Sequence, residues 1–379
     1  MGILNCRYEC HYYLKDETSL TKKLKKGEVN KNRPIIQINP NFPKKLNNFP
    51  YIVDISKYSD LIDEKIVSYI KNNKLNYKSY SGYISDIFNP NPNQFPNGNI
   101  FIGKINSNNE IEGYGIYIFK DKKIIIEGIW EKGDIVFGRI FFPEDDIYEG
   151  ELSHLMPHGK GQFLLSNGDI YKGDFVLSEM TGKGTYIFSD KTYYCGDFTN
   201  GAFNGEGSMK WTNGDEYHGI FSDSCLNGKG KIFNDLISEK YTGNFENNEF
   251  NGDGIYKYQN EDKYEGNFEN GIRKGKGTYT LQNGTEFQGT WDKDLPNGEG
   301  VIFYNKMKIK GIWKDGKKVR ILEILERNKN IKNIENIENI NLDIKTCKRK
   351  IIPSSLPHLS INEKTEISQY VLMTENHFI

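Results

Sequence analysis

The chain has 379 residues, and its 50 basic and 51 acidic side chains nearly cancel, so net charge indicates no class of partner. Five cysteines, at positions 6, 10, 195, 225 and 347, are too scattered for a disulfide framework and favour a reducing compartment. No run of about 18 apolar residues occurs, so we expect neither a membrane-spanning helix nor a secretory signal.

The first segment, residues 1–54, is basic and extended, and it begins with a candidate lipidation signal. Gly2 becomes a myristoylation acceptor once Met1 is removed, although Cys6 stands where the usual pattern has Ser or Thr. Cys6 is itself a candidate for palmitoylation, and a second signal is needed because one myristoyl chain binds membranes only weakly. Residues 1–50 hold ten Lys/Arg against four Asp/Glu, which favours an anionic membrane surface. The alternative is that Gly2 occurs by chance and the lysines are simply solvated.

The second segment, residues 55–96, is expected to hold an amphipathic helix followed by a linker. Apolar residues recur at helical spacing from about 55 to 72, at Ile55, Tyr58, Ile62, Ile66 and Ile70. This helix either docks on the following domain or is presented to a partner.

Residues 97–316 repeat about every 23 residues. An aromatic-x-Gly element begins at Tyr148, Tyr171, Tyr194, Tyr217, Tyr241, Tyr264 and Phe287, and a Gly-x-Gly element follows each one. The alternation predicts two strands per repeat, with rings and glycines on one face and polar residues on the other. A glycine face leaves a slot in which a neighbouring ring can lie, and Asn-Gly pairs between the segments predict hairpin turns. We expect about nine hairpins and a half.

The best-preserved copies are Tyr264-Glu265-Gly266-Asn267-Phe268 and Gly275-Lys276-Gly277-Thr278-Tyr279. They resemble the MORN (membrane occupation and recognition nexus) repeat. The resemblance implies a mainly β fold, an elongated single-layer antiparallel sheet of stacked hairpins with an aromatic groove. It also implies a scaffold or adaptor role at membranes or cytoskeletal structures. This chain mostly has Phe where the family usually has Trp in the first strand.

The ring face is the surface that the sequence singles out for binding, because a single-layer sheet leaves a long aromatic strip uncovered. The alternative is that most of the rings serve mainly to stack on one another. We expect a non-enzymatic scaffold whose groove binds a protein partner, by resemblance a helical or cytoskeletal segment. The end hairpins offer a route to a homodimer. The groove residues are Tyr148, Tyr171, Phe175, Tyr194, Phe198, Tyr217, Phe221, Tyr241, Phe245, Tyr264, Phe268, Phe287 and Trp291.

Two other functions remain open. The outward lysines Lys160, Lys183, Lys229 and Lys276 allow direct recognition of anionic phospholipids, and family analogy allows a ciliary or cytoskeletal structural role. No catalytic, nucleotide-binding or metal-ligand pattern stands out, so we expect no enzyme, cofactor, metal or nucleic-acid partner. The expected location is the cytoplasmic face of a plasma or cortical membrane, or the cytoplasm if the chain is not acylated.

The last segment, residues 317–379, is expected to be helical or of low complexity. Val319, Leu322 and Leu325 recur every third residue, a spacing that drifts around an α-helix. Disorder is the alternative for the Asn-rich stretch and for the tail from Pro353.

Overall fold

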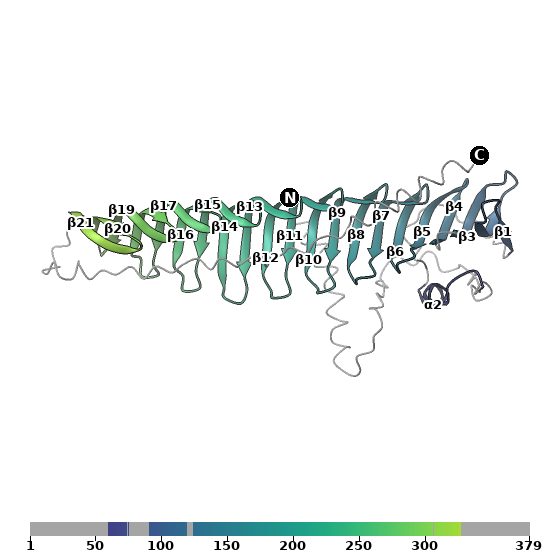
Figure 1. Cartoon of the computed structure of the whole chain (residues 1–379), viewed down its shortest axis with the longest axis horizontal. Coiled ribbons are helices and arrows are strands. Elements are labelled where there is room, and N and C mark those ends of the chain that lie inside the picture. Colours follow the sequence, from purple (N-terminus) through teal and green to yellow (C-terminus); the bar gives the residue numbers. More distant parts are fainter. Residues whose placement is uncertain (1–59, 74, 76–90, 120–123, 306, 327–379) are drawn as a thin grey trace, which may run out of the picture. The chain divides into compact units, whose positions relative to one another are not determined.

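The computed structural model describes residues 60–73, 75, 91–119, 124–305 and 307–326 (Figure 1). Gly2, Cys6, the basic cluster and the chain after residue 326 lie outside the described residues. The described strands form one antiparallel sheet of 21 strands, which confirms the predicted mainly β repeat stack. One helix, α2 (Glu64–Asn72), occurs in the same ranges.

The chain divides into two compact units. The N-terminal unit runs to Ser189 and also takes Phe198–Gly201. It contains α2 and the strands β1 (Pro92–Gln94), β2 (Ile100–Ile105), β3 (Ile111–Phe119), β4 (Ile124–Glu131), β5 (Asp134–Phe141), β6 (Ile147–Ser153), β7 (Met156–Leu164), β8 (Ile170–Val176) and β9 (Glu179–Ile187).

The C-terminal unit takes Asp190–Asp197 and continues from Ala202, so that β10 (Tyr193–Thr199) belongs partly to each. Its other strands are β11 (Ala202–Lys210), β12 (Glu216–Ser222), β13 (Cys225–Asn234), β14 (Glu239–Glu246), β15 (Glu249–Lys257), β16 (Lys263–Glu269), β17 (Ile272–Thr280), β18 (Glu286–Asp292), β19 (Leu295–Tyr304), β20 (Met307–Lys314) and β21 (Lys317–Glu326). From β11 to β21, each strand pairs with the next one along the chain.

Strands β12 and β13 show how one repeat is built. A two-residue turn at Asp223 and Ser224, with φ of 48° and 61°, closes the hairpin and matches the twist of its strands. Gly219 pairs with Gly230, and the register then shifts at a β-bulge between Gly219 and Ile220. The bulge lets the hairpin bend sharply within one repeat.

The glycines of each repeat serve two purposes. A Cβ on Gly230 would lie 2.5 Å from the Tyr217 hydroxyl oxygen, so this glycine provides the predicted slot for a ring. Gly228, the first glycine of the same Gly-x-Gly element, has φ of +64° and a Cβ there would meet Ile220 of the other face at 3.5 Å. The prediction that both glycines line the slot is therefore wrong, because the first one is needed for the left-handed backbone opposite the bulge.

Backbone and carboxylate hydrogen bonds join successive hairpins at both ends of the strands. At one end the turn amide of Ser224 donates to the carbonyl of Phe203 in the preceding hairpin at 3.0 Å. At the other end Asp262 accepts from the hydroxyl of Tyr279 at 2.9 Å and from the amide of Gln282 at 2.9 Å. Equivalent bonds recur along the sheet, so each hairpin is held by its neighbour as well as by its own ladder.

Helix α2 begins later than its apolar spacing predicts. Asp63 is its N-cap, with a carboxylate oxygen that accepts from the amide of Lys65 at 2.8 Å, and residues 60–62 before it form a turn and a bend. Ile62 is nevertheless buried, at 2% exposure, although it precedes the helix. A good cap fixes a helix start more strongly than the apolar pattern before it.

The other difference lies at residues 317–326, where a helix or low-complexity chain was expected and the structure has strand β21. Its pairing with β20 contains three register shifts. Each shift inserts one extra residue, so residues three apart face the same way. Ile321 and Ile324, for example, both pack against Met307 and Ile309. A bulged strand thus accounts for the three-residue apolar spacing. By pairing with β20, it also satisfies backbone hydrogen-bonding groups of that strand.

Candidate partner-binding faces

The predicted groove residues form a continuous column of rings on the glycine face. In most repeats the aromatic of the aromatic-x-Gly element lies between two other rings. One is the aromatic four residues later on the same strand, and the other is its equivalent in the next repeat. Tyr217, for example, is 5.1 Å from Phe221 and 5.1 Å from Phe245, with both pairs edge to face. Such contacts contribute about 0.5–1.5 kcal/mol each beyond area burial.

A third residue in each repeat covers the ring from the side away from the glycines. Phe203 stacks on Tyr194 with centroids 3.9 Å apart, and Phe250 stacks on Tyr241 at 3.7 Å. Both stand two residues before a Gly-x-Gly element. We call this position the lid, and its occupants from β7 to β19 are Pro157, Met180, Phe203, Leu226, Phe250, Arg273 and Pro296. The sequence interpretation missed the lid because its residue type changes from repeat to repeat.

The column is therefore a core, and the prediction of an exposed aromatic strip is wrong. The thirteen rings are between 0% and 3% exposed. The Tyr217 hydroxyl donates to the carbonyl of Ile220, at the bulge, at 2.9 Å, and burial raises the pKa of this phenol. A partner would have to open the hairpins to reach these rings.

The lid at position 273 is a buried arginine. The guanidinium of Arg273 lies 4.6 Å from the Trp291 ring centroid and is 0% exposed. Its Nε donates to Asp294 at 3.2 Å and its Nη1 donates to the Tyr258 hydroxyl at 3.1 Å. The charge is thus paired, and the planar group fills a slot that an aliphatic or aromatic lid fills in most of the other repeats.

The opposite side of the sheet, which we call the ladder face, carries the residues between the glycines. In the Gly-x-Gly elements these are Lys160, Lys183, Glu206, Lys229, Asp253, Lys276 and Glu299. All four lysines are exposed, and the Lys160 ammonium is 2.8 Å from a carboxylate oxygen of Asp174. Carboxylates interrupt the lysines, so this row is no uniform basic strip.

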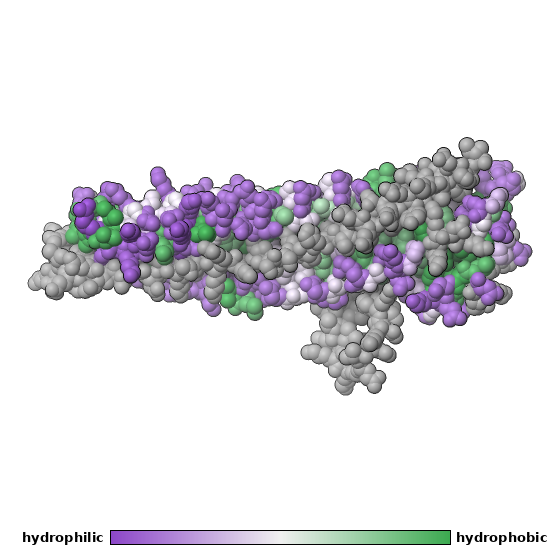
Figure 2. Space-filling model, in the orientation of Figure 1, coloured by the Kyte–Doolittle hydropathy of each residue, from purple (hydrophilic) through white to green (hydrophobic). Residues whose placement is uncertain are grey.

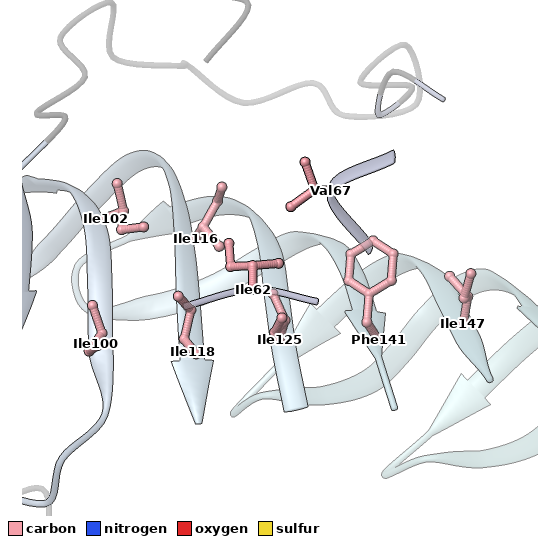
Figure 3. Packing of buried hydrophobic residues seen from close by; sticks show 9 residues of the cluster. All are labelled: Ile62, Val67, Ile100, Ile102, Ile116, Ile118, Ile125, Phe141 and Ile147. Carbon is pink, nitrogen blue, oxygen red and sulfur yellow. The ribbon is translucent and has the colours of Figure 1, made fainter. Parts of the chain in front are cut away.

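In the N-terminal unit the ladder face changes character and receives α2 (Figure 3). Ile62 and Val67 lie over isoleucines that replace the polar residues of later repeats. We call this apolar surface the helix seat, and it consists of Ile100, Ile102, Ile116, Ile118, Ile125, Phe141 and Ile147. Burying an aliphatic side chain there contributes about 1.5–3 kcal/mol.

A buried charge cluster fixes the C-terminal end of α2 on the seat. Arg139, at 1% exposure, donates from Nε to Glu149 at 2.8 Å and lies 3.4 Å from Glu127. Its Nη1 donates to the carbonyl of Asn73, just after α2, at 2.5 Å. Burial raises the pKa of Glu127, while Arg139 and a hydrogen bond from Tyr114 oppose that shift. An arginine that binds a helix C-terminus and two carboxylates orients the helix as well as holding it.

In the C-terminal unit the ladder face has an open hollow across β17, β18 and β19. It is lined by Lys276, Gly277, Thr278, Gln288, Gly289, Thr290 and Glu299. On the side drawn in Figure 2, hydrophilic residues predominate over this unit. Polar side chains therefore lie on both sides of the paired glycines Gly277 and Gly289.

Residues 60–73, 75, 91–119, 124–305 and 307–326 contain no group of three or more His, Cys, Asp or Glu placed to hold a metal ion. In the same part of the chain, no helix is long and apolar enough to cross a membrane.

The fold and its buried column define a β-hairpin repeat protein. Seven segments match the MORN repeat model, at residues 107–123, 148–170, 171–193, 194–216, 241–263, 264–286 and 287–306. The intervening stretches 124–147 and 217–240 contain the hairpins β4–β5 and β12–β13. No curated protein sequence matches the chain significantly.

Among solved structures, the chain is similar to the TCP10 domain of Danio rerio CPAP. The domain alone is 11% identical with a TM-score of 0.27, covering 62% of this chain and 100% of that one. In complex with a peptide of Danio rerio STIL it is 7% identical with a TM-score of 0.26, covering 62% and 98%. The SAS-4 TCP domain of Drosophila melanogaster with a proline-rich motif of Ana2 is 14% identical with a TM-score of 0.25, covering 45% and 88%.

Proposed function

We propose that this chain is a non-enzymatic scaffold that binds a helical protein segment on the ladder face of its MORN repeats. One observation carries the proposal: the ladder face already binds a helix, α2, by apolar packing and by Arg139 at the helix end. The glycine face is filled by the chain's own rings and lids. The ladder face of the later repeats is therefore the broad surface left for a partner.

The partner's chemistry follows from the hollow at β17–β19. Lys276 and Glu299 supply both charges, and Thr278, Gln288 and Thr290 supply neutral donors and acceptors. A polar segment with mixed charge complements this surface better than the apolar helix face that α2 presents to the seat. Cytoskeletal segments of that kind are partners that the family resemblance favours.

Direct phospholipid recognition by the repeats is the weaker alternative. The lysines expected to bind lipid alternate with Glu206, Asp253 and Glu299, which repel an anionic leaflet. Membrane association therefore depends on Gly2 and Cys6, and we propose the cytoplasmic face of a membrane as the location if they are acylated. No observation separately favours a ciliary role.

A photo-crosslinking amino acid tests whether the ladder face binds a protein partner. At position 278, inside the hollow, it should capture one protein from cells that express the full chain. At Asn247, an exposed turn residue, it should not. Thr278→Arg with Gln288→Arg should abolish co-purification of that protein without changing the Tm. Equal capture from both positions, or unchanged co-purification, would reject the ladder face.

Vesicles test the lipid alternative. The Gly2→Ala/Cys6→Ser chain should not float with vesicles of phosphatidylcholine and phosphatidylserine. Flotation of that unacylated protein, abolished by changing Lys229 and Lys276 to Glu, would instead support a lipid-binding module.

A further inference from the structure

The loop between β13 and β14 departs from the repeat pattern. Gly243 follows Gly219 by 24 residues, whereas Gly219 follows Gly196 by 23, so this loop holds one extra residue. Its tip is apolar, and Leu236 there is 75% exposed. In the preceding repeat the same loop is the polar turn Asn213-Gly214. Exposed departures from a local pattern are where function, more than folding, is expected to determine the residues.

The ladder face beside this loop carries two exposed apolar side chains. Phe233 is 38% exposed and Ile255 is 39% exposed. Phe233 pairs with Lys240, and Ile255 pairs with Thr242, so the two apolar residues flank β14 from the strands on either side of it. A bound segment with apolar side chains of its own would cover both.

Three lysines near these apolar residues lack a counter-ion. Lys229, Lys231 and Lys240 are exposed on β13 and β14, and within the described part of the chain none of them forms an ion pair. Lys240 also lies directly opposite Lys257 of β15. Like charges in directly opposite positions destabilise a sheet, so an acidic group bound here would relieve that repulsion.

The carboxylates at adjoining ladder positions are already engaged. Glu216 of β12 forms an ion pair with Lys210, and Asp253 of β15 accepts a hydrogen bond from Asn267 at 2.5 Å. The surface between them is therefore complementary to a segment that combines carboxylates with apolar side chains. We call this surface the lysine patch, and it consists of Lys229, Lys231, Phe233, Lys240 and Ile255.

A segment of that composition occurs in this chain, outside the described residues. Residues 333–344 read Asn-Ile-Glu-Asn-Ile-Glu-Asn-Ile-Asn-Leu-Asp-Ile. They contain three carboxylates, at Glu335, Glu338 and Asp343, and no basic residue. The segment therefore offers one carboxylate for each lysine of the patch, with apolar residues between them.

The segment is long enough to reach the patch. Strand β21 ends at Glu326, and β14 is seven strands away in the same compact unit, which is about 34 Å at the usual strand spacing. Glu338 follows Glu326 by twelve residues, which span up to about 40 Å when extended. Asp343 lies further along the chain and reaches further still.

We propose that the lysine patch binds residues 333–344 of the same chain, with the three carboxylates near the three lysines and the apolar side chains against Phe233 and Ile255. The occupant is this segment because it matches the patch in charge and in apolar content, and because its tether to β21 raises its local concentration. While bound, it covers lysines that would otherwise face an acidic partner or an anionic membrane. This inference is independent of the proposed partner at the hollow on β17–β19.

A photo-crosslinking amino acid in place of Phe233 tests the contact in the purified full chain. Benzoylphenylalanine keeps an aromatic ring at this exposed position, and mass spectrometry should locate its crosslinks within residues 333–344. Val176, which is 49% exposed in the N-terminal unit, is the matched control position and should give no crosslink to that segment. In an equal mixture of isotope-labelled and unlabelled chains, each crosslinked pair should carry one label only, because the patch and the segment belong to one molecule.

A charge exchange tests the recognition. Changing Lys229, Lys231 and Lys240 to Glu should lower the crosslink yield at least about fivefold, and so should changing the three carboxylates of the segment to Lys. A chain with all six changes should crosslink like the wild type. Because these positions are on the surface or outside the described residues, an unchanged Tm verifies folding.

Salt gives a measurement that needs no charge variant. The yield should fall as NaCl is raised from about 0.05 to 0.5 M, because salt screens exposed charges. Crosslinks that fall outside residues 333–344, that join labelled to unlabelled chains, or that equal those from position 176 would overturn the proposal. So would a yield that neither charge reversal nor salt reduces.

Discussion

The ring of Tyr217 lies directly on Gly230, so closely that a Cβ on this glycine would sit 2.5 Å from the hydroxyl oxygen and 2.6 Å from a ring carbon. Neither group can retreat, because Phe221 and Phe245 hold the ring on both sides. The aromatic and the glycine are thus one packing unit, although they come from different strands.

Gly230→Ala should therefore destabilise the protein by about 1–3 kcal/mol, the usual cost of overpacking. Lys231→Ala, one residue further on an exposed position, is the control and should change the free energy of unfolding little. Urea denaturation measures both. In a Tyr217→Ala background the cost of Gly230→Ala should nearly disappear, and a cost that persists there would show that the ring is not its cause.

Removing Asp294 alone should destabilise the protein far more than replacing Arg273 and Asp294 together. Asp294→Ala leaves a buried guanidinium without its carboxylate and should cost about 3–5 kcal/mol. The double change Arg273→Leu/Asp294→Asn copies the equivalent pair two repeats earlier, in which the Leu226 amide donates to the Asn248 side chain at 2.7 Å. It should retain wild-type stability within about 1 kcal/mol in thermal unfolding, since a well-packed apolar replacement is often neutral. A double variant as unstable as Asp294→Ala would contradict this.

Arg139→Met should make stability depend on pH through Glu127. Burial already raises the pKa of this carboxyl above 4.5, and removing Arg139 removes the charge that opposes the rise. The folded state then binds the proton more tightly than the unfolded state, so the free energy of unfolding should fall as pH rises above about 4.5.

Tm measured from pH 4 to 8 gives the comparison, with Glu127→Gln/Arg139→Met as the control that should lose this added slope. Hydrogen exchange of residues 64–72 should also accelerate in Arg139→Met, because Arg139 holds the end of α2. A pH profile parallel to that of the wild type would refute the role of Glu127.

Acylation gives a prediction that concerns the chain outside the described residues. The wild type should incorporate an alkyne myristate in cells and sediment with membranes, whereas Gly2→Ala should do neither. Cys6→Ser should keep the myristate but bind less firmly, because a single acyl chain is a weak anchor. If Gly2→Ala still sediments with membranes, the anchor lies elsewhere.

The repeat, its hairpins and the ring slot at glycines such as Gly230 could be predicted from the sequence, because Tyr, Phe and Gly recur at fixed spacing. The lid could not, since Leu226, Arg273 and Pro296 share a position but no chemistry. Without the lid, the column looked like an open groove. The available signal was positional: the residue two places before each Gly-x-Gly element is seldom polar.

The helix seat was missed for a related reason. Ile102 and Ile116 fill ladder positions that are mostly polar in later repeats, so a pattern averaged over the repeats hides them. The position of α2 depends on this local departure and on Arg139. Sequence periodicity describes what the repeats share, and the binding surfaces lie where the repeats differ.

The bond from each turn amide to the preceding lid carbonyl uses backbone atoms alone. It recurs from Ser224 to Phe203, from Asn248 to Leu226 and from Gly271 to Phe250, at 3.0, 3.1 and 2.9 Å. Such a backbone hydrogen bond between hairpins depends little on which side chains the turn residue and the lid residue carry. Duplication or deletion of a segment of about 23 residues would therefore recreate the same joint, and evolution can change the number of hairpins without inventing a new interface.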